Sequence, residues 1–145
     1  MYIEVNRYRT HAAQYELRTQ FTGAALSDSH EPNDSPAAAG QIGNTVTANI
    51  GYGSDAEDWY EFTATASSTL LRVTNLHPAG IAMGFVGRIE AQSLAGTVLS
   101  NNGQNTAPGR VDNLPAFSTT SGAKYRIKVS RLNTRNAAPY RIDIL

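Results

Sequence analysis

Hydrophobic and polar residues alternate with a period of two in several short stretches of the chain. Residues 124–132 are the clearest case, because Tyr125, Ile127 and Val129 alternate with charged and polar residues. Such alternation predicts a β-strand with one face in the core and one face in solvent. The same pattern predicts further strands over residues 44–50, 58–64, 69–76, 83–91, 97–100 and 139–145.

Glycine, asparagine, serine and proline separate these stretches, and no stretch holds a helical period over three turns. Alanines in residues 22–30 and 35–42 tolerate a helix, but the neighbouring Gly and Pro limit it to about one turn. Because parallel strands need crossover helices, the pattern excludes a doubly wound α/β fold. We predict an all-β fold, an antiparallel jelly-roll-like β-sandwich of about seven to nine strands.

Composition narrows the classes of function. The 145 residues suffice for one domain, and 12 Lys and Arg balance 12 Asp and Glu, so we expect no basic surface for nucleic acid. The chain has no cysteine, which removes disulfides and thiolate chemistry. No apolar stretch approaches the roughly 20 residues that span a bilayer. Residues 1–9 also have no apolar signal-peptide core, so neither membrane insertion nor a signal peptide is expected in this chain.

The beginning of the chain repeats its end, apart from one inserted residue. The paired residues are Ile3 with Ile127, Val5 with Val129, Arg7 with Arg131, Thr10 with Thr134, Ala12 with Ala137, Ala13 with Ala138 and Tyr15 with Tyr140. General β composition produces part of such agreement. We interpret residues 1–21 as a β-hairpin that resembles the closing hairpin of a preceding repeat.

An isolated hairpin is only marginally stable in water, so this one is expected to dock on its own domain or on a neighbouring one. The residues expected to make that contact are Ile3, Val5, Tyr8, Tyr15 and Leu17. Residues 22–43 then form a linker with an acidic loop, and residues 44–145 form the β-sandwich. This organisation predicts head-to-tail contact with another copy or with a neighbouring repeat.

Two acidic segments contain the side chains that could bind a metal ion. The segment EPND supplies Glu31, Asn33 and Asp34, and a second segment, just before a predicted strand, supplies Asp55 and Asp58, with Glu57 as a further candidate. Calcium takes about six to eight oxygen ligands from carboxylates, amides, backbone carbonyls and water. The alternative is a solvated surface loop, because Pro, Asn, Asp and Ser are common loop residues. If the two segments meet, they form a calcium site.

Four motifs occur in the chain in an order that is typical of a known protein family. EPNDSPAAA, then DAEDWYEFTA, then GAKYRIKV and a terminal PYRIDI resemble the bacterial pre-peptidase C-terminal domain, a family that includes the collagen-binding domains of clostridial collagenases. The resemblance covers about residues 30–145. It implies a jelly-roll-like β-sandwich on a secreted protein, without catalytic activity and often stabilised by calcium.

The resemblance also implies particular metal ligands. The Glu, Asn and Asp of the family's first motif fall on Glu31, Asn33 and Asp34, and the Asp before the aromatic pair falls on Asp58. The family's other Asp commonly lies two positions earlier, where this chain has Ala56. Asp55 is displaced by one residue, so the second half of the site departs from the family's pattern.

Catalysis has little support in the sequence. There is no Gly-x-Ser-x-Gly and no His-Glu-x-x-His motif, and the three histidines, His11, His30 and His77, fall in predicted loops. Trp59 is interpreted as a packing residue rather than a carbohydrate or peptide platform. We predict a non-catalytic extracellular calcium-binding module that acts as a structural repeat or self-assembling subunit. The alternative is a substrate-binding accessory domain of a secreted hydrolase, with an insoluble extracellular polymer as its partner.

Overall fold

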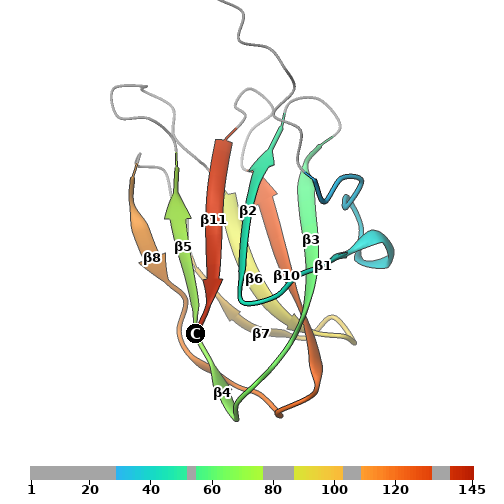
Figure 1. Cartoon of the computed structure of the whole chain (residues 1–145), viewed down its shortest axis with the longest axis vertical. Coiled ribbons are helices and arrows are strands. Elements are labelled where there is room, and N and C mark those ends of the chain that lie inside the picture. The colour runs from blue at the N-terminus through green and yellow to red at the C-terminus, as the bar shows by residue number, and fades with distance from the viewer. Residues whose placement is uncertain (1–28, 52–54, 77–86, 103–108, 132–137) are drawn as a thin grey trace, which may run out of the picture.

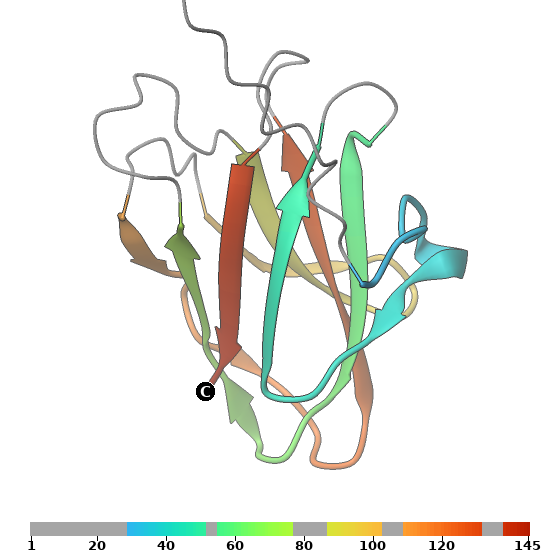
Figure 2. The ribbon, with the colours of Figure 1, turned by 45° about the horizontal axis from the view of Figure 1, so that its top comes forward.

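Two β-sheets pack face to face in the part of the chain that the computed structural model describes, which is residues 29–51, 55–76, 87–102, 109–131 and 138–145 (Figures 1 and 2). The first sheet has the strand order β1-β3-β10-β6-β7 and the second has the order β2-β11-β5-β8. A two-stranded ribbon, β4-β9, lies beside them. The predicted all-β sandwich is confirmed, and its two main sheets hold nine strands among the described residues.

The strands are short, and all pairs are antiparallel except one. The first sheet consists of β1 (Gly40–Gln41), β3 (Glu57–Thr63), β10 (Lys124–Arg131), β6 (Gly87–Ser93) and β7 (Val98–Asn101). The second consists of β2 (Thr45–Ile50), β11 (Ala138–Ile144), β5 (Leu71–Asn75) and β8 (Val111–Asn113), and the ribbon of β4 (Ser68–Thr69) and β9 (Phe117–Ser118). β1 runs parallel to β3, with Gly40 opposite Tyr60.

The alternating pattern located most of these strands correctly. β2, β3, β7, β10 and β11 begin and end within two residues of the predicted ranges. The predicted strand over residues 69–76 is divided into β4 and β5, because Leu70 leaves the ladder and exchanges two backbone hydrogen bonds with Leu145. β6 starts at Gly87, and the earlier residues of its predicted range, 83–86, lie outside the described residues.

Three strands were not predicted, and each is only two or three residues long. β1, β8 and β9 are too short to display an alternating pattern, so only their pairing with longer strands defines them. The predicted single turn of helix near residue 36 is present as the 3-10 helix η1 (Pro36–Ala38). β1 and η1 both belong to residues 22–43, so part of this segment follows the edge of β3.

The core lies between the two sheets and is filled from both. β10 and β11 occupy central positions, β10 between β3 and β6 and β11 between β2 and β5. The predicted inward residues Ile127 and Val129 are fully buried, while Tyr125 is partly buried and packs against the edge of the core. The core residues are Val46, Ala48, Ile50, Tyr60, Phe62, Ala64, Leu71, Val73, Ile89, Ala91, Leu114, Phe117, Ile127, Val129, Tyr140 and Ile142.

Trp59 packs on the outer face of the first sheet, opposite to Tyr60 and the core. Only 7% of it is exposed, and the Lys128 ammonium lies 5.2 Å from the centre of its ring. A buried indole covered by a lysine fits the predicted packing role better than an open binding platform. The predicted hairpin, residues 1–21, and its contact residues Ile3, Val5, Tyr8, Tyr15 and Leu17 lie outside the described residues.

Candidate metal centre

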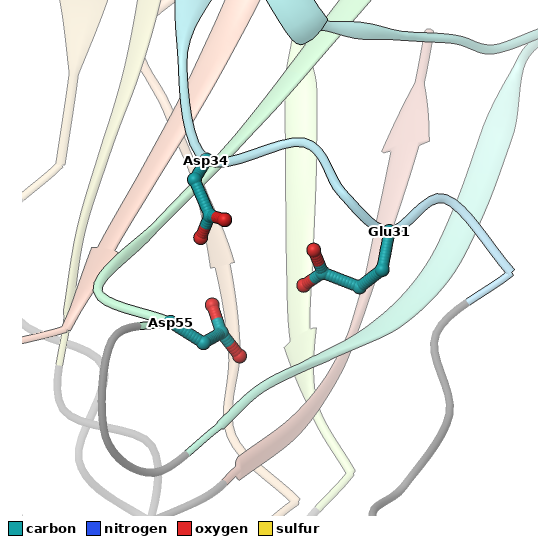
Figure 3. A group of neighbouring side chains, drawn as sticks. All are labelled: Glu31, Asp34 and Asp55. Carbon is teal, nitrogen blue, oxygen red and sulfur yellow. The ribbon is translucent and has the colours of Figure 1, made fainter.

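Three carboxylates from the two acidic segments meet at one end of the sandwich. Glu31, Asp34 and Asp55 each place a carboxylate oxygen within 4.8 Å of the others. Figure 3 shows the three side chains pointing toward one another, Glu31 and Asp34 from the loop before η1 and Asp55 from the segment that leads into β3. Segments more than twenty residues apart in the sequence therefore supply one acidic cluster, as the sequence predicts for a calcium site.

Backbone hydrogen bonds hold the first acidic segment against the start of β3. The Trp59 N–H donates to the Asn33 carbonyl at 2.9 Å, and the Asn33 N–H donates to the Glu31 carboxylate at 3.2 Å. The Glu31–Pro32 peptide bond is cis. The 3-10 helix that follows is closed by the Ala38 N–H donating to the Ser35 carbonyl at 3.0 Å. The loop thus has a defined course before the chain joins the sheet at β1.

Asp55 is held from the opposite side by the end of β2. Its carboxylate accepts a hydrogen bond from the Gly51 N–H, and the Gly51 carbonyl accepts one from the Arg131 guanidinium at the end of β10. A Cβ on Gly51 would lie 2.5 Å from the Asp55 Oδ2 atom, so only glycine permits this approach. The Arg131 N–H also donates to the Ala56 carbonyl at 3.2 Å, which fixes the segment on both sides of Asp55.

The groups around Asp55 do not fully offset the cost of burying its negative charge. Burial is the main cause that raises the pKa of the Asp55 carboxyl above its usual value, and the nearby negative charge of Asp34 raises it further. The Gly51 hydrogen bond, the Asp58 side chain and the positive charge of Arg131 act in the opposite direction but do not cancel these causes. The cluster therefore favours the arrival of either a proton or a cation.

A buried amide adds to the chemistry that suits a hard cation. The Asn33 side chain is 0% exposed, and neither its oxygen nor its nitrogen has a hydrogen-bond partner among the described residues. The Asp55 Oδ1 atom is also buried without a hydrogen bond there. Unpartnered buried oxygens are costly, and carboxylate and amide oxygens are the ligand types that calcium prefers. The residues present thus fit a calcium ion.

The other two candidates lie close by but outside the cluster of three. Asp58 is fully buried at the start of β3, and its carboxylate accepts a hydrogen bond from the Tyr140 hydroxyl. Glu57 instead binds Lys128 at 2.6 Å and accepts a hydrogen bond from the Trp59 indole at 3.2 Å. Asp58 is therefore beside the cluster on its core side, whereas Glu57 belongs to the outer face of the sheet.

Three residues that shape this site were not singled out as such from the sequence. The alternating pattern marked Tyr140 as a core residue, but it carried no sign that its hydroxyl meets Asp58. The roles of Gly51 and Arg131 depend on three strand ends coming together. The sequence does contain one feature that could have drawn attention to Arg131: Arg7 occupies the equivalent position in the first copy of the repeated segment.

No family model and no curated protein matches the sequence. Among solved structures, the chain is similar to the pre-peptidase C-terminal domain of a collagenase from Bacillus anthracis, with 17% identity and a TM-score of 0.49 over 72% of this chain and 92% of that one. It is also similar to a beta-glucosidase from Paenibacillus barengoltzii, with 11% identity and a TM-score of 0.37 over 72% of this chain but 11% of that one.

A third similar structure is the C-terminal CBM6 of LamC, a marine laminarinase from Zobellia galactanivorans, with 15% identity and a TM-score of 0.30 over 61% of this chain and 73% of that one. The collagenase domain is of the same class as the family that the sequence motifs resemble. At these identities the likeness is one of fold. Across the described residues, no helix is long and apolar enough to cross a membrane.

Proposed function

We propose that the chain is a non-catalytic, extracellular, calcium-binding β-sandwich module that acts as a structural repeat. The observation that carries the calcium part is the meeting of Glu31, Asp34 and Asp55 beside the buried Asn33 amide. Three ionised carboxylates at this spacing repel one another, and a cation between them relieves that repulsion without protonating any of them. Glu31, Asn33, Asp34 and Asp55 are the proposed ligands, and Asp58 supports them from the core side.

A calcium ion at this place would join the entry of the chain to the sheet. The first acidic segment precedes every strand among the described residues, and Asp55 precedes β3. The ion would therefore fasten the loop to the strand that it already contacts through Asn33 and Trp59. In a tandem chain, the same loop is the last part of the connection between two units. The ion would therefore stiffen the junction between neighbouring repeats.

A calcium titration tests the metal part. The melting temperature is measured in chelator and in millimolar Ca²⁺, and the fluorescence of Trp59, the single tryptophan, is followed at the same time. A ligand that binds only the folded state raises the free energy of unfolding by about 2.7 kcal/mol at a hundredfold excess over its Kd. Asp34→Asn and Asp55→Asn should each abolish most of this gain.

The matched control for these variants is Asp112→Asn. Asp112 lies on β8, where it pairs with Arg110 at 2.8 Å, so the substitution removes one acidic charge outside the cluster. This variant should keep the calcium-dependent gain. Equal melting temperatures with and without calcium in the unmodified chain would contradict the metal part of the proposal.

The alternative is an accessory domain of a secreted hydrolase that grips an insoluble polymer. It is favoured by exposed apolar side chains on the hairpin of β6 and β7, where Leu94, Val98 and Leu99 are 46%, 43% and 37% exposed. Co-sedimentation with insoluble polysaccharide or collagen tests it, with Leu94→Ser and Val98→Ser as variants that should release the bound protein. Binding that is unaffected by these variants would count against this surface.

A further inference from the structure

Strand β2 forms one edge of the second sheet. The order of that sheet is β2-β11-β5-β8, so β2 has β11 on one side and no other described strand on the other (Figure 1). β2 is six residues long and pairs with β11 along its length without a break in the register. A regular edge strand of this kind presents a row of backbone N–H and C=O groups with which a further strand can pair.

The hydrogen-bond pattern identifies the residues of β2 whose backbone faces the open side. The Ile144 N–H donates to the Asn44 carbonyl at 2.8 Å, so these two residues form a hydrogen-bonded pair at the start of the β2 and β11 ladder. Such pairs alternate along an antiparallel ladder, so Val46 bonds to β11, whereas Thr45 and Thr47 point their backbone groups the other way. In the part of the chain that the structure describes, these backbone groups of Thr45 and Thr47 have no hydrogen-bond partner.

The other edges of the two sheets have features that hinder pairing with another chain. β1 is only two residues long, and the pairing of β7 with β6 shifts its register between Ala91 and Gln92. β8 is three residues long, and its central Asp112, which pairs with Arg110, lies opposite Val73 and so faces the interior side of the sheet. Short strands, bulges and inward-facing charges are common protections of a sheet edge. β2, with the sequence TVTANI, has no charge, proline or bulge.

We propose that the open edge of β2 binds the same edge of a second copy of the chain, related to the first by a twofold axis beside Val46. Twofold symmetry makes the two β2 strands antiparallel, as the other strand pairs in this sheet are. Thr45 of each copy then lies opposite Thr47 of the other. Because the backbone N–H and C=O of both residues face the partner strand, this register forms four backbone hydrogen bonds between the copies.

The side chains of β2 suit a second copy of the same strand. Val46, which is 3% exposed, meets Val46 of the other copy on the interior side of the sheet. The exposed Thr45 and Thr47 meet on the outer side, and threonine pairs across antiparallel strands are favourable. Since β2 has no charged residue, pairing it with itself brings no like charges together. The result is one antiparallel sheet of two joined halves, with β8 at each end.

Sedimentation velocity on the full chain, over a range of protein concentrations, tests the proposed dimer. A contact made by one strand from each copy is small, so we expect a weak monomer–dimer equilibrium that shifts toward the dimer as the concentration rises. A chain that stays monomeric up to its solubility limit would overturn the proposal. The proposed contact uses no residue of the acidic cluster, so calcium binding on the same chain succeeds or fails independently of it.

Two charged double variants test the strand and its register. Thr45→Lys with Thr47→Lys places like charges opposite one another in the dimer, and Thr45→Glu with Thr47→Glu does the same. Each variant alone should raise the dimer dissociation constant by about tenfold or more, whereas an equimolar mixture should restore dimers with one copy of each. The matched control is Val111→Lys with Asn113→Lys, two exposed positions on the edge strand β8, and it should leave dimerisation unchanged. Dimers that survive both variants, or a mixture that restores none, would contradict the pairing through β2.

Amide hydrogen exchange measures the same contact in the unmodified chain, so it does not depend on whether the variants fold. The Thr45 and Thr47 amides should exchange more slowly as the protein concentration rises, while the Val46 amide, which bonds to β11, should be protected throughout. Slow exchange of both threonine amides at every concentration would show that another segment of the same chain covers this edge. That result would overturn the proposal, and so would fast exchange of both amides at every concentration.

Discussion

The hydroxyl of Tyr140 on β11 donates a hydrogen bond to the buried carboxylate of Asp58 on β3. The Tyr60 hydroxyl lies 2.7 Å from the Tyr140 hydroxyl, and because Tyr140 has a single proton to give, Tyr60 donates to it. Burial first, and then the charge of Asp58, raises the pKa of Tyr140 well above its usual value. The phenol therefore stays protonated and links the two sheets beside the acidic cluster.

Removing this hydroxyl should weaken both the fold and the metal site. Tyr140→Phe leaves the Asp58 carboxylate without its buried donor, so we expect a loss of about 1–3 kcal/mol in the free energy of unfolding, measured by denaturant titration. Calcium affinity measured by calorimetry should fall as well, because Asp58 is less firmly held next to Asp55. The matched control is Tyr125→Phe, whose hydroxyl accepts an exposed hydrogen bond from the Thr120 N–H at 2.9 Å and should matter less.

Whether a carboxylate substitution in the cluster raises or lowers the free energy of unfolding should depend on calcium. Without a divalent cation, Asp34→Asn removes a like charge that acts on Asp55, and we expect a small gain in the free energy of unfolding. With calcium present, the same variant lacks a ligand and should be less stable than the unmodified chain. Thermal melts in chelator and in calcium check this reversal, and a loss of stability in both conditions would contradict it.

Acid should remove a stabilising ion pair on the outer face of the first sheet. The Lys124 ammonium at 2.7 Å is the main cause that lowers the pKa of Glu61 below 4.5, followed by a hydrogen bond from Gln41. A lowered carboxyl pKa stabilises the folded state above the usual pKa and loses that contribution as the pH falls through the folded value. Glu61→Gln should therefore cost about 0.5 kcal/mol at neutral pH, and the difference should disappear in paired denaturant titrations once the pH falls below the lowered folded pKa of Glu61.

The central strands should be the most sensitive part of the core. Ile127→Ala on β10 creates a cavity between two sheets, because the side chain is fully buried, and we expect a loss of about 2–5 kcal/mol in the free energy of unfolding. Leu94→Ala, at an exposed position on the turn between β6 and β7, should change the stability by less than about 0.5 kcal/mol. Similar losses for the two variants would contradict the assignment of the core.

The sequence was sufficient to predict the fold class and the long strands, because their period of two follows from burying one face of a pleated strand. The same pattern placed Ile127, Val129, Tyr140 and Ile142 inward, and all four are fully buried. It could not place β1 or β8, since two or three residues contain no period, and their position depends on the edge of a longer strand.

The sequence by itself also determined the donors of the candidate metal centre, because only certain side chains offer oxygen atoms to a hard cation. Which of them meet was decided by the tertiary structure. Asp55 lies where the chain passes from β2 in the second sheet to β3 in the first, and there it meets Glu31 and Asp34. The alternation of β3 turns Asp58 toward Tyr140 and Glu57 toward Lys128. Neighbouring residues on a strand face opposite sides of its sheet, so a run of acidic residues divides between two environments that composition alone does not distinguish.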